Sequence, residues 1–260
     1  MNLEIRKFLS VLALGTAATV GVSAQSYYSE LISQPLSTTS FGYSRNDDSF
    51  FGPVSLGFSF NFFGNTYTQL YINNNGNVTF GGGESSFSSA PLNNYAGGMP
   101  MIAPFFADVD TRNGASGLVY LNNSVANQLI ITWDAVGYFD NQANLLNSFQ
   151  LVIRGPGYSV PSGEGQIGFY YKTMDWDRDQ FSAVGTAGFG DGLAAVNAGE
   201  VSISGSQTAG FNNTLENNHY WFTLSEGGVP AASVPEPGTW GAIGVAGVAG
   251  LVTWLRRRKA

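Results

Sequence analysis

Short runs in which apolar and polar residues alternate constrain the fold of this chain more than any other feature. In residues 55–64, SLGFSFNFFG, the apolar side chains are Leu56, Phe58, Phe60 and Phe62, and small or polar residues separate them. Successive side chains of a β-strand point to opposite faces, so this period of two predicts a strand with one buried face and one solvated face.

Further strands are expected where short runs rich in β-branched and aromatic residues are bounded by Gly, Asn, Asp or Pro. These runs are residues 67–80, 128–133, 148–155, 165–172, 183–190 and 219–224. In 148–155, Phe149, Leu151 and Ile153 share one face. Within 67–80, Asn75-Gly76 is typical of a type I′ hairpin, whose two central residues need positive φ angles.

No helical period extends over ten residues or more between the two ends of the sequence. We therefore predict an all-β fold, a single antiparallel β-sandwich-like domain over residues 50–225. Residues 25–49 are expected to be a polar lead-in segment. Residues 226–233, with their Gly, Pro, Ala and Ser, are expected to be a linker.

The sequence begins with the pattern of a secretory signal peptide. Arg6 and Lys7 form a basic start, an apolar stretch of small residues follows, and Ala24 closes a small-x-small cleavage sequence. We expect residues 1–24 to be removed by cleavage between Ala24 and Gln25.

The other end of the sequence combines an uncharged stretch with a basic cluster. As a helix, residues 238–255 would rise roughly 27 Å, close to the thickness of the hydrocarbon core of a bilayer. Trp240 and Trp254 suit the aromatic belts of a membrane, and the cations that follow would keep the C-terminal end in the cytoplasm. We expect a single transmembrane helix here. The membrane-stop cluster after it is Arg256, Arg257, Arg258 and Lys259.

This tail, residues 234–260, resembles the PEP-CTERM sorting signal, in which a short motif, an apolar helix and a basic cluster follow one another. Its sorting motif would be Val234, Pro235, Glu236 and Pro237. The resemblance implies recognition by exosortase, an integral-membrane cysteine transpeptidase of bacteria that make exopolysaccharide. It also implies export to the cell envelope or the extracellular surface or matrix, with single-pass anchoring until the tail is processed.

The middle of the chain resembles the NIDO domain, an extracellular domain named from nidogen and shared with tectorin- and mucin-type matrix proteins. The segments that carry the resemblance are residues 70–80, 102–112, 117–120, 131–139, 147–153, 167–176 and 187–192. IAPFFADVDTR, residues 102–112, and ITWDAVGYF, residues 131–139, are the most specific of them. The resemblance implies an extracellular, matrix-associated, non-enzymatic module, and it implies no mapped ligand site.

Together these features predict a non-enzymatic surface or extracellular-matrix protein. It would act in adhesion or assembly within an exopolysaccharide layer, as in a biofilm, with an exopolysaccharide or a matrix protein as its partner. The alternative is a carbohydrate-binding module, assisted by calcium, that holds a specific glycan. The membrane would be a partner through the C-terminal helix, at least transiently.

Charge and cysteine content exclude several classes of function. The chain has 11 Lys and Arg residues against 18 Asp and Glu, and six of the cations are Arg6, Lys7 and residues 256–259. Nucleic-acid binding needs a basic surface and is not expected. Cysteine is absent, so disulfides and cysteine zinc sites are excluded.

Asp108 and Asp110 are candidate calcium ligands, because carboxylates two residues apart on a strand point to one face and offer hard oxygen atoms. The alternative is that they cap turns or pair with Arg112. No cofactor other than this calcium is expected.

Asp175, Asp177 and Asp179 form a second acidic pattern, which matches only the start of an EF-hand loop. Position six is Gln180 instead of Gly, and position twelve is Thr186 instead of Glu. Alternating acids in an extended segment are more typical of a solvated face, so this reading is favoured over a metal site.

Catalytic patterns are weak in this sequence, and we expect no enzyme. His219 is the only histidine, and no G-x-S-x-G motif occurs. A histidine at a strand edge, bonded to a neighbour, is the favoured interpretation.

Four aromatic residues lie next to turn residues instead of alternating along strands. They are Tyr95, Tyr138, Phe139 and Trp176. An exposed aromatic platform there would suit sugar stacking, whereas ordinary loop aromatics would cover the ends of the sandwich.

Overall fold

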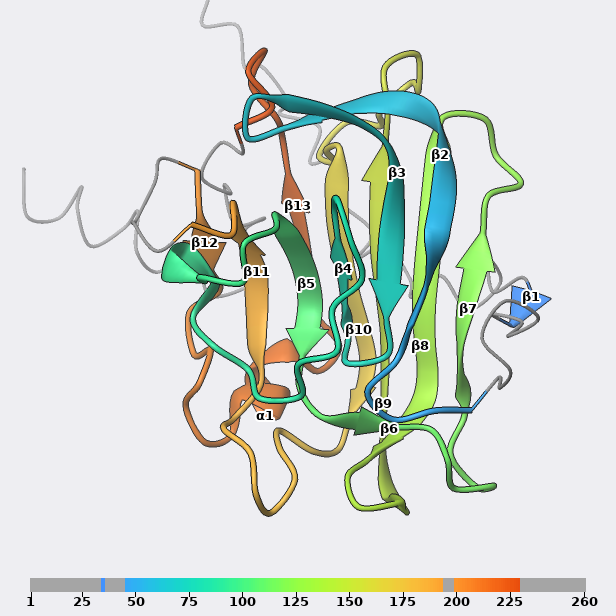
Figure 1. Ribbon diagram of the computed structural model, residues 1–260, viewed down its shortest axis with the longest axis vertical. Helices are drawn as coiled ribbons and strands as arrows, with labels where there is room; N and C mark the ends of the chain where they lie inside the picture. The colour runs from blue at the N-terminus through green and yellow to red at the C-terminus, as the bar shows by residue number, and fades with distance from the viewer. Residues whose placement is uncertain (1–33, 36–44, 194–198, 230–260) are drawn as a thin grey trace, which may run out of the picture.

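The computed structural model describes residues 34–35, 45–193 and 199–229 (Figure 1). The expected signal peptide and its cleavage site, the sorting motif, the helix over residues 238–255 and the basic cluster lie outside the described residues. Among the residues that are described, no helix is both long enough and apolar enough to cross a bilayer.

Two antiparallel sheets form the described structure, and their strands run side by side in Figure 1. The first sheet has the order β1-β7-β8-β9-β10-β13, and β6 pairs with β8 beside β7. Its strands are β1 Gln34–Pro35, β6 Val109–Asp110, β7 Leu118–Asn122, β8 Gln128–Tyr138, β9 Gln142–Arg154, β10 Ile167–Met174 and β13 His219–Phe222.

The second sheet has the order β12-β11-β5-β4-β3-β2. Its strands are β2 Phe50–Phe62, β3 Asn65–Asn73, β4 Asn77–Thr79, β5 Met101–Phe106, β11 Thr186–Gly190 and β12 Val201–Ser202. The helical elements of the described residues are a 3₁₀ turn, Leu92–Asn94, and the short helix α1, Phe211–Leu215. The all-β prediction is therefore confirmed, and every run marked as a strand by the sequence overlaps one.

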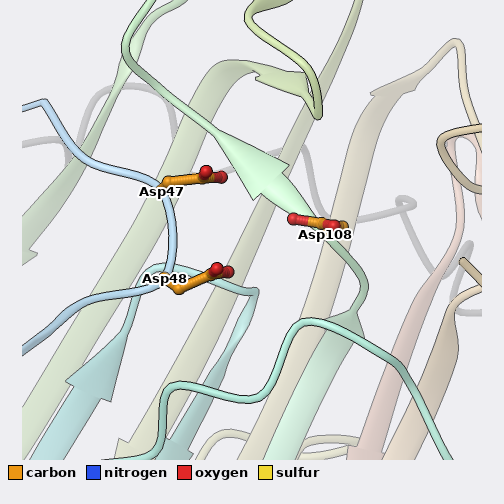
Figure 2. A group of neighbouring side chains, drawn as sticks. All are labelled: Asp47, Asp48 and Asp108. Atoms are coloured by element: carbon orange, nitrogen blue, oxygen red, sulfur yellow. The ribbon is translucent and has the colours of Figure 1, made fainter. Parts of the chain in front are cut away.

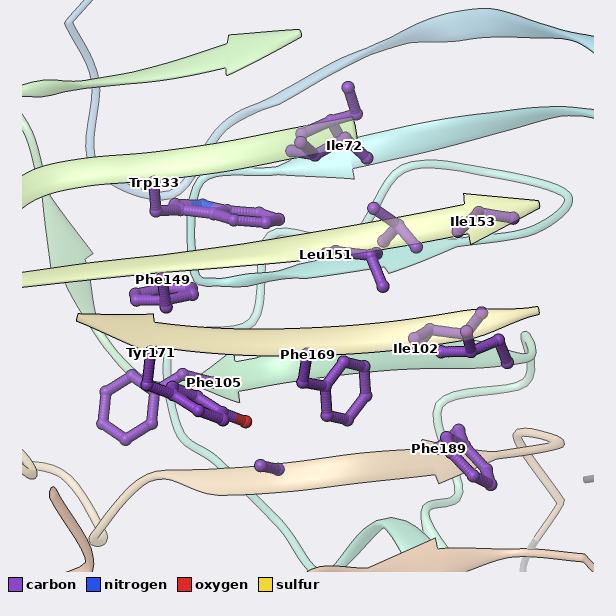
Figure 3. Close-up of a cluster of buried hydrophobic side chains, with 14 of the residues drawn as sticks. Ile72, Ile102, Phe105, Trp133, Phe149, Leu151, Ile153, Phe169, Tyr171 and Phe189 are labelled. Carbon is purple, nitrogen blue, oxygen red and sulfur yellow. The ribbon is translucent and has the colours of Figure 1, made fainter. Parts of the chain in front are cut away.

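Large apolar side chains from both sheets fill the space between them (Figure 3). Trp133 of β8 stacks on Phe149 of β9, with ring centroids 5.2 Å apart and planes inclined by 12°. Phe105 of β5 meets the edge of Phe149 at 5.6 Å. Leu56, Phe60 and Phe62 of β2 are buried as their alternation predicts, and Phe58 is half-buried. The sandwich has no disulfides and is held mainly by one large apolar core, with two smaller buried clusters outside it.

The outer face of β9, opposite Phe149, Leu151 and Ile153, is covered as well. Gln150 and Arg154 point away from the core residues of this strand, yet they are 0% and 2% exposed. The Arg154 guanidinium lies 4.3 Å from the centre of the Trp221 ring on β13, and Gln150 Nε2 donates to Thr132 Oγ1 of β8 at 2.7 Å. Long side chains of neighbouring strands thus cover the middle of the sheet on this face too.

The Asn75-Gly76 turn differs from its prediction. Asn73 pairs with Asn77, so the β3–β4 connection is a three-residue loop, residues 74–76, instead of a two-residue type I′ turn. Only Gly76 in this loop has a positive φ angle, +74°. The sequence identifies the hairpin but not its length, because one Gly in the left-handed region serves either loop.

The loop 74–76 reaches into the end of the sandwich and joins the two sheets. Its carbonyl oxygens accept hydrogen bonds from Trp133 Nε1 at 3.0 Å, from Phe105 N at 3.2 Å and from Ala107 N at 3.3 Å. The loop and the β5–β6 connection are therefore fixed to each other at the end of the molecule where polar side chains gather.

Candidate functional site

Three carboxylates meet at this end of the sandwich (Figure 2). Asp47 and Asp48 precede β2, and Asp108 lies between β5 and β6. Each offers one carboxylate oxygen, and these oxygens all lie within 4.8 Å of one another. We call Asp47, Asp48 and Asp108 the acidic cluster.

One arm of the cluster is the segment 45–49, which is tied to the loop after β6. Arg45 Nη1 donates to the carbonyl oxygens of Thr111 and Asn113, both at 2.8 Å, and of Ser116 at 2.7 Å. Asn46 N donates to Thr111 Oγ1 at 2.9 Å. These residues are thus part of the domain, whereas the sequence suggested a lead-in segment ending at residue 49.

The loop 74–76 holds both arms of the acidic cluster. Asn75 Nδ2 donates to Asp48 Oδ1 at 2.9 Å, and Asn75 Oδ1 accepts from Val109 N at 3.0 Å. Asn74 Nδ2 donates to the carbonyl oxygens of Val109 and Asn46. Two consecutive asparagines therefore set the position of Asp48 relative to Asp108.

Asp108 is the buried member of the cluster. It is 4% exposed, its Oδ1 has no hydrogen-bond partner, and its Oδ2 accepts from Ser182 Oγ at 3.4 Å. Burial, followed by repulsion from Asp48, Asp179 and Asp47, raises the pKa of Asp108 to about 8. A half-buried Asp47 shows the same effect, since burial and then the charges of Asp110 and Asp48 raise its pKa to about 6.

Asp110, the other candidate calcium ligand from the sequence, does not belong to the acidic cluster. It is fully buried and accepts hydrogen bonds from Arg112 Nε at 2.9 Å, from Arg112 Nη2 at 2.5 Å and from Asn141 N at 2.7 Å. Burial would raise its pKa, but these bonds hold the pKa below its ordinary value. The structure therefore contains the alternative interpretation, in which Asp110 pairs with Arg112.

Arg112 links Asp110 to the edge of the cluster. Its Nη2 lies 2.9 Å from Asp47 Oδ2 and 3.4 Å from Asp140 Oδ1. Because Arg112 forms ion pairs with three carboxylates, it neutralises the negative charge of the acidic cluster only in part. Asp108 has no ion pair among the described residues.

The aspartates at 175, 177 and 179 diverge instead of forming one site. Asp175 Oδ2 accepts from Leu146 N at 3.3 Å, and Asp177 Oδ2 accepts from Gly210 N at 2.7 Å. Asp179 caps the next turn by accepting from the backbone N–H groups of Phe181 and Ser182. The prediction of a solvated face is wrong for Asp179, which is 4% exposed.

Two of the four aromatic residues that lie next to turns are buried, so the alternative of an exposed platform does not hold for them. Trp176 and Tyr95 are buried; Trp176 Nε1 donates to the Val136 carbonyl, and Tyr95 Oη donates to Glu84 Oε2. Tyr138 and Phe139 are half-buried.

Two phenylalanines that the sequence did not single out are exposed beside the acidic cluster. Phe181 is 71% exposed and precedes Ser182, which contacts Asp108. Phe87 is 49% exposed and follows Ser86, whose carbonyl accepts from Asn75 Nδ2 at 3.2 Å. Neither stands in an alternating run; Phe87 lies in a Ser-rich stretch and Phe181 follows the acidic run of residues 175–179, so each could have been found only by its position between strands.

His219 lies at the start of β13, as its strand-edge interpretation expected. Its ring stacks on Tyr170 of β10, with centroids 5.4 Å apart and planes inclined by 11°. An open hollow of about 380 Å³ lies elsewhere, against Arg154, Tyr158 and Gln166. Arg154 is already paired there, with Glu164 Oε2 at 2.5 Å.

In metal-free buffer, the free energy of unfolding should fall as the pH rises from about 4 to about 8. With pKa values of about 8 for Asp108 and about 6 for Asp47, the folded state keeps protons that the unfolded chain releases near 3.8. The stabilisation from these retained protons is complete below the pKa of the carboxyl groups in the unfolded chain. It is lost as the pH rises through their pKa values in the folded state.

Urea denaturation across this pH range measures the effect. Asp108→Asn should flatten the upper part of the curve, whereas Glu216→Gln, an exposed carboxylate on another element, should leave its shape unchanged. A wild-type stability that rises steadily over the same interval would contradict the prediction.

Two family profiles match the sequence. The family described as NIDO related matches residues 19–224, and the PEP-CTERM protein-sorting motif matches residues 233–259. The second match includes the motif and the basic cluster named from the sequence.

Curated relatives match the chain at modest identity. Alpha-tectorin of Gallus gallus is 28% identical over 202 residues, which is 62% of this chain and 9% of the relative. Alpha-tectorin of Mus musculus is 28% identical over 75% of this chain and 10% of the relative, and nidogen of Drosophila melanogaster is 35% identical over 35% and 8%. The chain thus covers about a tenth of these proteins or less. No solved structure matches significantly.

Proposed function

Because the chain belongs to the NIDO-related family, we propose that it is a non-enzymatic exported protein that acts in adhesion or assembly within an exopolysaccharide layer. The observation that supports the proposal most strongly is that one sequence contains both of the family matches described above. A NIDO-related β-domain is followed directly by a PEP-CTERM protein-sorting motif, and the two together support an exported protein of the cell envelope or extracellular space.

The packing of the domain supports a binding or structural role. The space between the sheets is filled by side chains, and the cluster of acids lies on an end of the sandwich built from loops. Among the described residues, the one histidine, His219, stacks on Tyr170 of the neighbouring strand.

Deleting Val234–Pro237 should leave the protein in the inner-membrane fraction, because exosortase would no longer recognise the tail. The measurement is the share of protein in membrane, surface and medium fractions of the producing cells. Deleting the three linker residues 230–232, which precede the matched sorting motif, is the control and should allow normal release. Equal release of both variants would contradict the sorting assignment.

The exposed aromatic side chains beside the cluster favour a second candidate function, the carbohydrate-binding module. Phe181 presents most of its ring to solvent, and its partner in the structure is the half-buried Phe139, with centroids 5.9 Å apart. An aromatic face next to carboxylates and asparagines offers stacking and hydrogen bonds to a sugar.

Phe181→Ala should weaken binding of the exopolysaccharide of the producing cells about tenfold, while unfolding changes by less than about 0.5 kcal/mol. Leu193→Ala is the control, because Leu193 is also exposed but follows the far end of β11. Glycan binding that is the same in both variants, measured by affinity electrophoresis, would argue against a sugar platform at Phe181.

A further inference from the structure

We propose that Asp47, Asp48 and Asp108 bind a calcium ion, which fastens the segment 45–49 to the β5–β6 connection. The site differs from the Asp108–Asp110 pair that the sequence suggested, since Asp110 is committed to Arg112. The proposal goes beyond the function proposed above and does not depend on it.

The spacing of the carboxylates suits one shared ion. Calcium lies about 2.3 to 2.6 Å from its oxygen ligands, so two ligands of one ion can be up to about 5 Å apart. One oxygen of each aspartate lies within 4.8 Å of the other two, and Figure 2 shows the three side chains pointing toward a common space. The ligands therefore need no rearrangement of the backbone.

A second, independent observation is the unpartnered buried oxygen of Asp108. This side chain is 4% exposed and its Oδ1 has no hydrogen-bond partner. Buried polar atoms are almost always paired, and an unpaired one lowers stability. Asp47 Oδ1 is also buried without a partner. A cation between the carboxylates would satisfy both oxygens at once.

The chemistry of the surroundings favours calcium over other metals. The ligands are carboxylates, without histidine or cysteine, and such hard oxygen donors suit calcium or magnesium instead of zinc or copper. Two further oxygens nearby are buried without partners, Asn74 Oδ1 and Asp179 Oδ2. Calcium accepts six to eight oxygen ligands in flexible geometry, and water can complete the shell.

Bound calcium would act as a clamp between distant parts of the sequence. Asp47 and Asp48 stand before the first long strand, and Asp108 follows β5. The existing ties of the segment 45–49 include hydrogen bonds through Arg45, Asn46, Asn74 and Asn75 and the ion pair of Asp47 with Arg112. An ion that neutralises the mutual repulsion of the three aspartates adds a tie that depends on the calcium concentration outside the cell.

The test is the thermal melting of the full-length protein, purified with EDTA and then measured at about pH 8 with EDTA, calcium or magnesium. Calcium in excess of its dissociation constant should raise the melting temperature by about 3 to 10 °C. Millimolar magnesium should give a much smaller shift. Asp108→Asn should remove the calcium shift and raise the melting temperature in EDTA, because a buried repulsion is gone.

Two variants complete the test. Asp48 is exposed, so Asp48→Asn should fold normally. In a calorimetric titration its affinity for calcium should be at least about tenfold lower than that of the wild type. If Asp108→Asn does not fold, the Asp48→Asn variant still tests the proposal. Glu216→Gln removes one negative charge elsewhere and should keep the full shift. The proposal is overturned by the absence of a shift in the wild type, by an equal shift with magnesium, or by unchanged affinity in Asp48→Asn.

Discussion

Replacing Arg112 with alanine should reduce the free energy of unfolding by about 1 to 3 kcal/mol. The guanidinium contacts both oxygens of Asp110, whose side chain is fully buried. Arg112 is 43% exposed, so its removal opens Asp110 to water, and the loss is that of charge-assisted hydrogen bonds at a partly exposed pair. Asp47 would lose its ion pair as well, at 2.9 Å. Urea denaturation of the wild type and the variant at neutral pH measures the loss.

The double variant Asp110→Asn/Arg112→Ala is the control for this prediction. It removes the unpaired charge while the side-chain oxygen can still accept from Asn141 N, so it should be more stable than Arg112→Ala alone. The stability of Arg112→Lys should lie between that of the wild type and that of Arg112→Ala, because lysine cannot contact both carboxylate oxygens as arginine does. A loss below about 1 kcal/mol in Arg112→Ala would show that the pair behaves as an exposed one.

Gly76→Ala should prevent cooperative folding or destabilise the domain by more than about 3 kcal/mol. Gly76 has a φ angle of +74°, and an added Cβ would lie 1.8 Å from the Phe105 carbonyl oxygen. That oxygen belongs to the central strand β5 and cannot move without breaking the sheet. Circular dichroism and urea denaturation distinguish a weakened fold from a lost one.

Gly64→Ala is the matched control because it has the same backbone conformation without the close contact. Its φ angle is +77°, and nothing lies within 4 Å of an added Cβ. Only the cost of a left-handed alanine remains, about 1 to 2 kcal/mol. If both variants lost the same stability, backbone strain alone would account for the effect, and the loop would not be packed as described.

The strands could be predicted because their signal is local. Alternation in residues 55–64 identifies a buried face within one short run, and the structure buries Leu56, Phe60 and Phe62 accordingly. The outer face of β9 was not predictable in the same way, since Gln150 and Arg154 are covered by side chains from other strands. Sequence order does not reveal which strands are neighbours in a seven-stranded sheet.

The acidic cluster was predictable only in part. Asp108 was identified from its own segment, but its partners Asp47 and Asp48 lie in a stretch without any periodic pattern. Hydrogen bonds between residues more than 60 positions apart bring that stretch into place. Asp108 and Asp110 have the same local pattern and different partners, because only Asp110 lies within reach of Arg112.

The loop 74–76 also bears on how the protein ages chemically. An asparagine followed by glycine is prone to lose its side-chain amide when the next backbone nitrogen attacks it. Here Gly76 N donates to the Asn74 carbonyl at 2.8 Å, and the Asn75 amide is held by Asp48, Ser86 and Val109. The reaction therefore requires the loop to open. The extent of deamidation at Asn75 would then measure how long the loop has been open, and each event would place one more negative charge beside the acidic cluster.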